Sequence, residues 1–191
     1  IRVELGGTYF DVVYKGTTYP DFYVPVSGRH NVLAALFAFA VATLQGLTPD
    51  QIKNGLKIFQ PAGMRQEILQ IGGKTVIADC YNAAPESMRA AIDVLCECAP
   101  KGGRRVAILG DMLELGKHSI EIHRGIGGYL QDHGVDLLIA VGNGGVEIAQ
   151  GAVEAGMDPA KTLLFIDRND VDSIVKALID NICEGDTLLF K

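Results

Sequence analysis

The sequence predicts an α/β protein: a Rossmann-like, mostly parallel sheet with helices on both faces, preceded by a smaller segment of strands and helices. From residue 67 onward, short apolar runs alternate with longer segments in which apolar residues recur at helical spacing. Residues 1–25 instead contain strand-like stretches separated by glycine turns. Between these regions, Gln60-Pro61-Ala62-Gly63 ends a helix, so we expect domains at 1–62 and 63–191.

The composition is that of an ordinary globular chain. Its 191 residues leave room for one to two domains, with 48% hydrophobic and 21% charged residues. A net charge of -6 argues against a nucleic-acid-binding surface, which needs a basic face. The four cysteines lack paired C-x-x-C spacing, so we expect free thiols in a reducing cytoplasm and no metal site in this chain.

In the first segment, strands are expected at residues 2–5, 9–14 and 22–26. The apolar run Val32–Leu44 falls short of the roughly 20 residues that span a membrane, and we interpret it as a buried helix with Ser27 as its N-cap. The chain lacks an initiating Met and begins with strand-like residues, which suggests a piece of a longer protein.

A second helix is expected from Thr48 to about Phe59. Thr48, Pro49 and Gln51 fit a capping box with proline at the first helical position. Ile52, Leu56 and Phe59 would then share one face of this helix.

The second segment predicts a hairpin followed by strand–helix repeats. The expected strands are 67–71, 74–78, 105–109, 137–141, 163–166 and 187–190, and the expected helices are 85–98, 119–133, 145–155 and 171–183. Residues 142–145 have the glycines of a tight turn but not the full G-x-G-x-x-G spacing. His118, His123 and His133 lack metal-binding spacing, so they are expected to be surface or partly buried structural residues.

The stretch Asp79–Met88 carries the chemistry most clearly. It places a carboxylate, a phenol and an amide between the end of a strand and the start of a helix, where open α/β sheets bind ligands. Pro85 suits the first turn of that helix. On spacing alone, an ordinary loop rich in turn residues explains this stretch equally well.

Four stretches resemble motifs of the Mur ligases, in the same order. Gly28–Asn31 is similar to the family's G-x-H-N, Gly63–Glu67 to G-M-R-x-E, Asp79–Met88 to D-x-Y-N-A-x-P-x-S-M, and Leu109–Gly116 to L-G-D-M-x-E-L-G. The resemblance implies that residues 1–62 are the end of the central ATP-binding domain and that 63–191 are a nearly complete C-terminal substrate-binding domain.

The resemblance also implies an ATP site. Its candidate residues are His30, Asn31, Arg65, Asp79, Tyr81 and Asn82. Asn31 would lie beside the adenine, Arg65 would grip phosphate or ribose oxygens, and Asp79 would accept hydrogen bonds from ribose hydroxyls. Alternatively, Asn31 and His30 merely cap a helix, and Arg65 is a surface residue paired with Glu67. Ala34 and Ala84 stand where the family often has polar residues.

The candidate substrate-binding residues are Ser87, Asp111, Glu114 and Lys191. By resemblance, Asp111 and Glu114 would orient the ammonium group of an incoming dipeptide, although solvated loop acids explain them equally well. Lys191 stands where the family commonly continues K-G-S-R toward the incoming substrate.

The implied reaction is an ATP-dependent amide ligation between UDP-MurNAc-tripeptide and D-alanyl-D-alanine, through an acyl phosphate, in peptidoglycan precursor synthesis. The phosphate-binding loop and the Mg²⁺ ligands would lie upstream, so this chain alone is expected to be inactive. A monomeric cytoplasmic enzyme without catalytic residues in this chain is expected. Two alternatives are another amide ligase of the Mur or folylpolyglutamate type and a non-catalytic α/β binding module.

Overall fold

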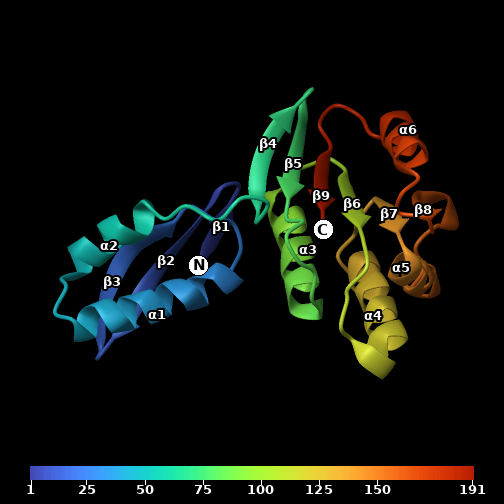
Figure 1. The fold of residues 1–191 in the computed structure, drawn as a ribbon. Helices are drawn as coiled ribbons and strands as arrows, with labels where there is room; N and C mark the ends of the chain where they lie inside the picture. The colour runs from blue at the N-terminus through green and yellow to red at the C-terminus, as the bar shows by residue number, and fades with distance from the viewer. The chain divides into compact units, whose positions relative to one another are not determined.

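A computed structural model describes residues 1–191 (Figure 1). The chain divides into two compact units, Ile1–Ala62 and Gly63–Lys191, each with its own hydrophobic core. No helix is both long and apolar enough to cross a membrane.

The first unit contains a three-stranded antiparallel sheet in the order β1-β2-β3, with β1 at Arg2–Glu4, β2 at Gly7–Tyr14 and β3 at Thr17–Val24. β3 begins five residues earlier than predicted and includes Pro20. A proline is tolerated there because β3 is an edge strand and its register with β2 shifts at this point. The Asp21 N–H donates to the Asp11 carboxylate across the irregularity, at 3.0 Å.

Two helices cover this sheet: α1 at His30–Leu44 and α2 at Pro49–Lys57. The predicted capping box of α2 is confirmed, because the Thr48 hydroxyl accepts from the Gln51 N–H and the Gln51 side chain accepts from the Thr48 N–H. Phe59 was wrongly placed on this helix. The helix ends at Lys57, and the Phe59 side chain is 52% exposed.

The prediction that residues 32–44 form a buried helix is only half right. Val32, Ala35 and Phe39 pack against the sheet, in a core with Phe10 and Phe22. The helix is apolar on all sides, but the sheet covers only one of them, so the opposite face is exposed at Leu33, Phe37 and Val41.

Ser27 is not the N-cap of α1. That position is Arg29, and no side chain caps it. The Ser27 hydroxyl instead donates to the Glu4 carbonyl oxygen and accepts from the Gly6 N–H, both at 2.8 Å. Ser27 therefore ties the turn between β1 and β2 to the end of β3.

The second unit is built on a six-stranded sheet in the order β4-β5-β9-β6-β7-β8. β4 runs antiparallel to β5, and the other neighbouring pairs are parallel. Its strands are β4 at Glu67–Ile71, β5 at Lys74–Ala78, β6 at Arg105–Leu109, β7 at Leu137–Val141, β8 at Thr162–Phe165 and β9 at Thr187–Phe190. The chain end, marked C in Figure 1, lies at the tip of β9.

Helices lie on both faces of this sheet, as predicted. α3 at Pro85–Cys98, α4 at Ser119–Asp132 and α5 at Asn143–Glu154 pack on one face, in a core that includes Ile77, Leu109 and Leu189. α6 at Val171–Asn181 covers the other face, through Leu178 against Val106, Ile139 and Leu188. Short 3₁₀ turns occupy Gly116–His118 and Pro159–Lys161. Successive side chains of a strand point to opposite faces of the sheet, so Leu189 lies in the first core and Leu188 in the second.

α4 and α5 cross at very short range because glycines line their contact. A β-carbon at Gly127 would overlap the Ile148 carbonyl oxygen, and one at Gly151 would overlap the Arg124 carbonyl oxygen. Gly128 faces away, with the nearest atom, the Ala155 β-carbon, at 3.9 Å. The close approach thus depends on particular glycines and not on glycine content in general.

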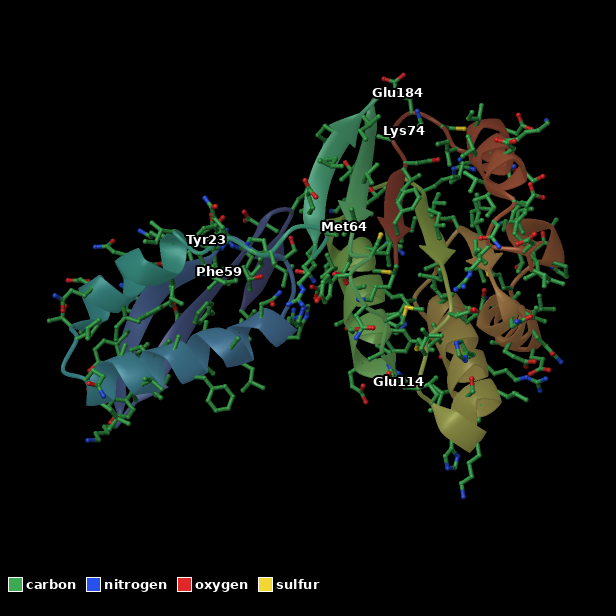
Figure 2. The ribbon with its side chains drawn as sticks, viewed as in Figure 1. Tyr23, Phe59, Met64, Lys74, Glu114 and Glu184 are labelled. Carbon is green, nitrogen blue, oxygen red and sulfur yellow. The ribbon has the colours of Figure 1, made fainter.

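An ion pair braces the amino ends of β6 and β9. Arg104 Nη2 lies 2.6 Å from Asp186 Oδ2, and the Cys183 N–H donates to the same oxygen at 2.7 Å. Burial pushes the pKa of Asp186 upward, but the hydrogen bonds from Arg104 and Cys183 outweigh it, so the pKa is lowered. Lys74 and Glu184, labelled in Figure 2, mark this end of the sheet.

Candidate functional site

The predicted site residues of the second unit gather where the parallel strands end. In open α/β sheets, loops at this edge bind ligands, because all the parallel strands deliver their carboxyl ends there. The loops after β5 and β6 contribute polar side chains, the turn after β7 contributes backbone N–H groups, and the chain end contributes Lys191.

Asp79 is the centre of this group. Its Oδ2 accepts from Lys191 Nζ at 2.6 Å, and its Oδ1 accepts from the Gln66 N–H at 3.2 Å. Lys191 Nζ also donates to the Asn82 carbonyl oxygen, at 2.9 Å. The side chains of Lys191 and Asp79 are only 3% and 13% exposed, so this is a buried ion pair. The structure thus brings a predicted substrate residue and predicted nucleotide residues into direct contact.

Arg65 stacks on Tyr81, with its guanidinium carbon 4.1 Å from the ring centroid. The residues on either side of Arg65 have left-handed backbones, with φ of 60° at Met64 and 52° at Gln66. The Tyr81 N–H donates to the Met64 carbonyl oxygen at 3.2 Å. Two hydrogen bonds and one ring contact therefore hold the Arg65 turn, labelled at Met64 in Figure 2, against the Asp79 loop.

Ser87 has a local structural role. Its hydroxyl accepts from the Ala84 N–H and donates to the Ala84 carbonyl oxygen, both at 3.0 Å, at the start of α3. Pro85 occupies the first helical position, as predicted. Substrate binding by Ser87 stays a prediction.

Asp111 also has a partner that the sequence did not suggest. Its Oδ1 accepts from the Gly144 N–H at 2.6 Å and from the Gly145 N–H at 3.3 Å, at the N-terminus of α5. A carboxylate is favourable there because the first N–H groups of a helix lack partners within it. The glycine-rich turn after β7 therefore holds an anion from its own chain. Glu114, labelled in Figure 2, is exposed and has a φ of 63°.

His123 binds the loop that carries Asp111, through the backbone of Met112. Its ring is 2% exposed, so the expectation that it is a surface or partly buried residue is wrong. Nε2 accepts from the Met112 N–H at 3.0 Å, and Nδ1 lies 2.7 Å from the Ser119 carbonyl oxygen. These two contacts fix the neutral tautomer that carries its proton on Nδ1. No spacing pattern identified His123, because its partners are backbone atoms.

His118 and His133 fit the structural expectation. His118 is 59% exposed beside Glu121, and His133 stacks on Tyr129 at 3.9 Å between centroids. The structure contains no group of three or more His, Cys, Asp or Glu side chains placed to hold a metal ion. The four cysteines are free thiols.

In the first unit, His30 and Asn31 begin α1. The Asn31 side-chain Nδ2 donates to the Ser27 carbonyl oxygen at 2.8 Å, and its N–H donates to the Gly28 carbonyl oxygen at 3.1 Å. Asn31 thus stabilises the turn before the helix, although neither its side chain nor any other caps the helix N-terminus. Contact with adenine stays a prediction for both residues.

Comparisons with known proteins agree with this architecture. A family profile described as "Mur ligase, glutamate ligase domain" matches residues 64–191. The UDP-N-acetylmuramoyl-tripeptide–D-alanyl-D-alanine ligase of Bacillus subtilis is 33% identical over 186 residues, which are 97% of this chain and 39% of that protein. The corresponding Escherichia coli ligase is 36% identical over 143 residues, 74% of this chain and 31% of that one.

A crystal structure of MurF from Acinetobacter baumannii superimposes with a TM-score of 0.82 at 28% identity, covering all of this chain and 40% of that one. A folylpolyglutamate synthase from Thermotoga maritima has the same fold, with a TM-score of 0.58 at 18% identity, covering 98% of this chain and 41% of that one. The chain spans about two fifths of the length of the Bacillus subtilis relative.

Proposed function

Because this chain belongs to the Mur ligase family, we propose that it is part of an ATP-dependent ligase that joins UDP-MurNAc-tripeptide to D-alanyl-D-alanine. Residues 63–191 would be its C-terminal substrate-binding domain, and residues 1–62 the end of its central ATP-binding domain. The identity to ligases of that name, over nearly the whole chain in Bacillus subtilis, supports this substrate pair. The enzyme would act as a monomer in the cytoplasm.

One observation carries the proposal: the Arg65–Tyr81 stack beside the Asp79 loop, at the carboxyl ends of the strands. A guanidinium that stacks by its flat face keeps its N–H edges available for phosphate or ribose oxygens. Arg65 and Tyr81 are both exposed and therefore accessible to a nucleotide. Asp79 is largely buried, so it could contact a ribose only through the small part of its side chain that is exposed.

The proposed reaction has two steps. The γ-phosphoryl group of ATP passes to a carboxylate oxygen of the tripeptide, which releases ADP and forms an acyl phosphate. The amine of D-alanyl-D-alanine then loses a proton and attacks the acyl carbon, which forms the amide and expels phosphate. Arg65 would hold the nucleotide while the anionic carboxylate of the tripeptide approaches its γ-phosphoryl group, and closure would exclude water from the acyl phosphate.

Mg²⁺ is expected to accompany ATP, and its protein ligands are expected upstream of this chain. Arg65 is the exposed cation beside the Asp79 loop that this unit offers a nucleotide, because the ammonium group of Lys191 is already paired with Asp79.

The test is ATP-dependent phosphate release by the complete ligase, with UDP-MurNAc-tripeptide and D-alanyl-D-alanine, with single amino acids, or without an amine. Release that requires both the tripeptide and the dipeptide is expected. Release with a single amino acid would reassign the protein to a sister ligase. A folded protein that releases no phosphate with any acceptor would favour a binding module. Arg65→Ala should raise the KM for ATP about tenfold or more, because it removes a charge-assisted contact with the nucleotide.

A further inference from the structure

We infer that Lys191 is a positioning residue that fixes Arg65 for nucleotide binding, acting through Asp79. This inference rests on the function proposed above. The sequence suggested a different role for Lys191, in which it faces the incoming substrate. The contacts of its ammonium group point inward instead.

The backbone of Lys191 is fixed on both sides before its side chain begins. Its N–H donates to the Ile108 carbonyl oxygen at 2.9 Å, and its carbonyl oxygen accepts from the Gly110 N–H at 2.8 Å. The Asp79 N–H donates to the Phe190 carbonyl oxygen at 2.9 Å. These hydrogen bonds join the ends of β5, β9 and β6 at Lys191, so the backbone position from which its side chain extends is fixed.

The ammonium group needs its partners because it is almost completely buried. An uncompensated charge in such a place is strongly unfavourable, so Lys191 and Asp79 are bound to one another. The second hydrogen bond, to the Asn82 carbonyl oxygen, closes the loop 79–82 around the same nitrogen. The Asp79 carboxylate is thereby fixed in orientation as well as in position.

The other carboxylate oxygen transmits that orientation to Arg65. Oδ1 of Asp79 accepts the Gln66 N–H, which holds the residue directly after Arg65. Met64 and Gln66 both have left-handed backbones, a conformation that non-glycine residues adopt only when surrounding contacts enforce it. Those contacts are the Asp79 carboxylate on one side and the Tyr81 N–H on the other. Without Lys191, Asp79 would lose its orientation and the turn would lose the hydrogen bond at the Gln66 N–H.

The experiment replaces Lys191 in the complete ligase by methionine, which keeps the length and apolar stem of the side chain but removes the charge. The KM for ATP should rise about tenfold, with the KM for D-alanyl-D-alanine within twofold of wild type. Lys176→Met is the matched control, because Lys176 forms an exposed ion pair with Asp180 on α6 and should leave both constants unchanged.

A double-mutant cycle tests the route through Arg65. If Lys191 acts by positioning Arg65, then Lys191→Met combined with Arg65→Ala should be no worse than Arg65→Ala alone, within about twofold. A loss of overall stability would instead multiply the two effects. Multiplied effects, or a rise confined to the KM for the dipeptide, would overturn the inference.

Amide hydrogen exchange provides a readout that does not depend on catalysis. In Lys191→Met, the Gln66 and Tyr81 amides should exchange at least tenfold faster, while amides in the middle of β7 keep their protection. Unchanged exchange in an active enzyme would refute the positioning role and leave the proposed function standing. Faster exchange in an enzyme without ligase activity would refute the function and leave the positioning role standing.

If the methionine variant does not fold, Lys191→Arg takes its place. Arginine keeps the charge but replaces the compact ammonium group, which donates to both Asp79 and the Asn82 carbonyl oxygen, with a longer and rigid planar fork. The same change in the KM for ATP and in Gln66 exchange is expected, at smaller amplitude, and wild-type values for both would overturn the inference.

Discussion

Replacing Asp111 should destabilise the second unit, because its carboxylate serves as the missing cap of α5. The Gly142 position before this helix has no capping side chain of its own. Asp111 Oδ1 supplies the acceptor for the Gly144 and Gly145 N–H groups, from a loop more than thirty residues earlier. The perturbation is Asp111→Ala, with Asp111→Asn as the intermediate case.

The magnitude follows from the two contacts. Loss of a helix cap costs about 0.5–2 kcal/mol, and a half-buried charge at a helix N-terminus adds up to about 2 kcal/mol. We expect about 2 kcal/mol for Asp111→Ala and about 1 kcal/mol for Asp111→Asn, since the amide oxygen still accepts a hydrogen bond but the charge is gone. For a unit of this size, 2 kcal/mol lowers the unfolding temperature by about 6 °C.

The assay is thermal unfolding together with amide exchange of Gly144 and Gly145. Both amides should exchange about tenfold faster or more in Asp111→Ala. Glu114→Gln is the matched control, because this carboxylate lies on the same loop and is exposed. If Asp111→Ala unfolded at the same temperature as Glu114→Gln, with unchanged exchange, the capping role would be refuted. Asp111 would then be available as a ligand for the ammonium group of the dipeptide.

Three further predictions concern the rest of the second unit. Gly127→Ala should destabilise this unit by about 2–4 kcal/mol in urea unfolding, because the new β-carbon overlaps the backbone of α5. Gly128→Ala, the control, should be neutral or slightly stabilising, and equal effects of the two variants would contradict the packing argument. The folded-state pKa of Asp186 is lowered from 3.8, so the stabilisation that its carboxylate gives the fold is present above pH 3.8 and disappears as the pH falls through the folded-state pKa. Asp186→Asn should therefore flatten the plot of unfolding free energy against pH below about pH 4. An unchanged slope would contradict the stabilising role of the carboxylate. Burial raises the pKa of Cys96 to about 11, so iodoacetamide at pH 8 should modify the exposed Cys183 well before Cys96, and equal rates by mass spectrometry would disprove the assignment.

The sequence predicted the second sheet almost residue by residue, because its strands are short apolar runs bounded by turns. The errors lie at ends and edges. β3 starts early because an edge strand tolerates Pro20, and α2 stops before Phe59 because helix ends are weakly encoded. The exposure of Leu33 was missed for a different reason: an all-apolar helix does not reveal which of its faces a small sheet will cover.

The site was predicted less completely than the fold. Motifs indicated which residues belong near the strand ends, and the structure brings Arg65, Tyr81, Asp79, Asn82 and Lys191 together there. What the motifs did not indicate is which of these residues bind one another. Their contacts join positions as far apart as 79 and 191, and spacing along the chain carries no information about such pairs.

Asp79 and Asp111 show why residue type and position on the sheet are insufficient. Both follow parallel strands of the same sheet, and both were expected to contact ligands. The first meets a buried ammonium group, and the second meets the N–H groups of a helix start. In each case hydrogen-bond donors of the same chain already hold the carboxylate, so part of its acceptor capacity is used before any ligand arrives. Arg65 differs because its guanidinium group stacks on the ring of Tyr81 and forms no ion pair with an acid. On this argument, the exposed cation and not the buried acids should determine the affinity for a nucleotide in this unit.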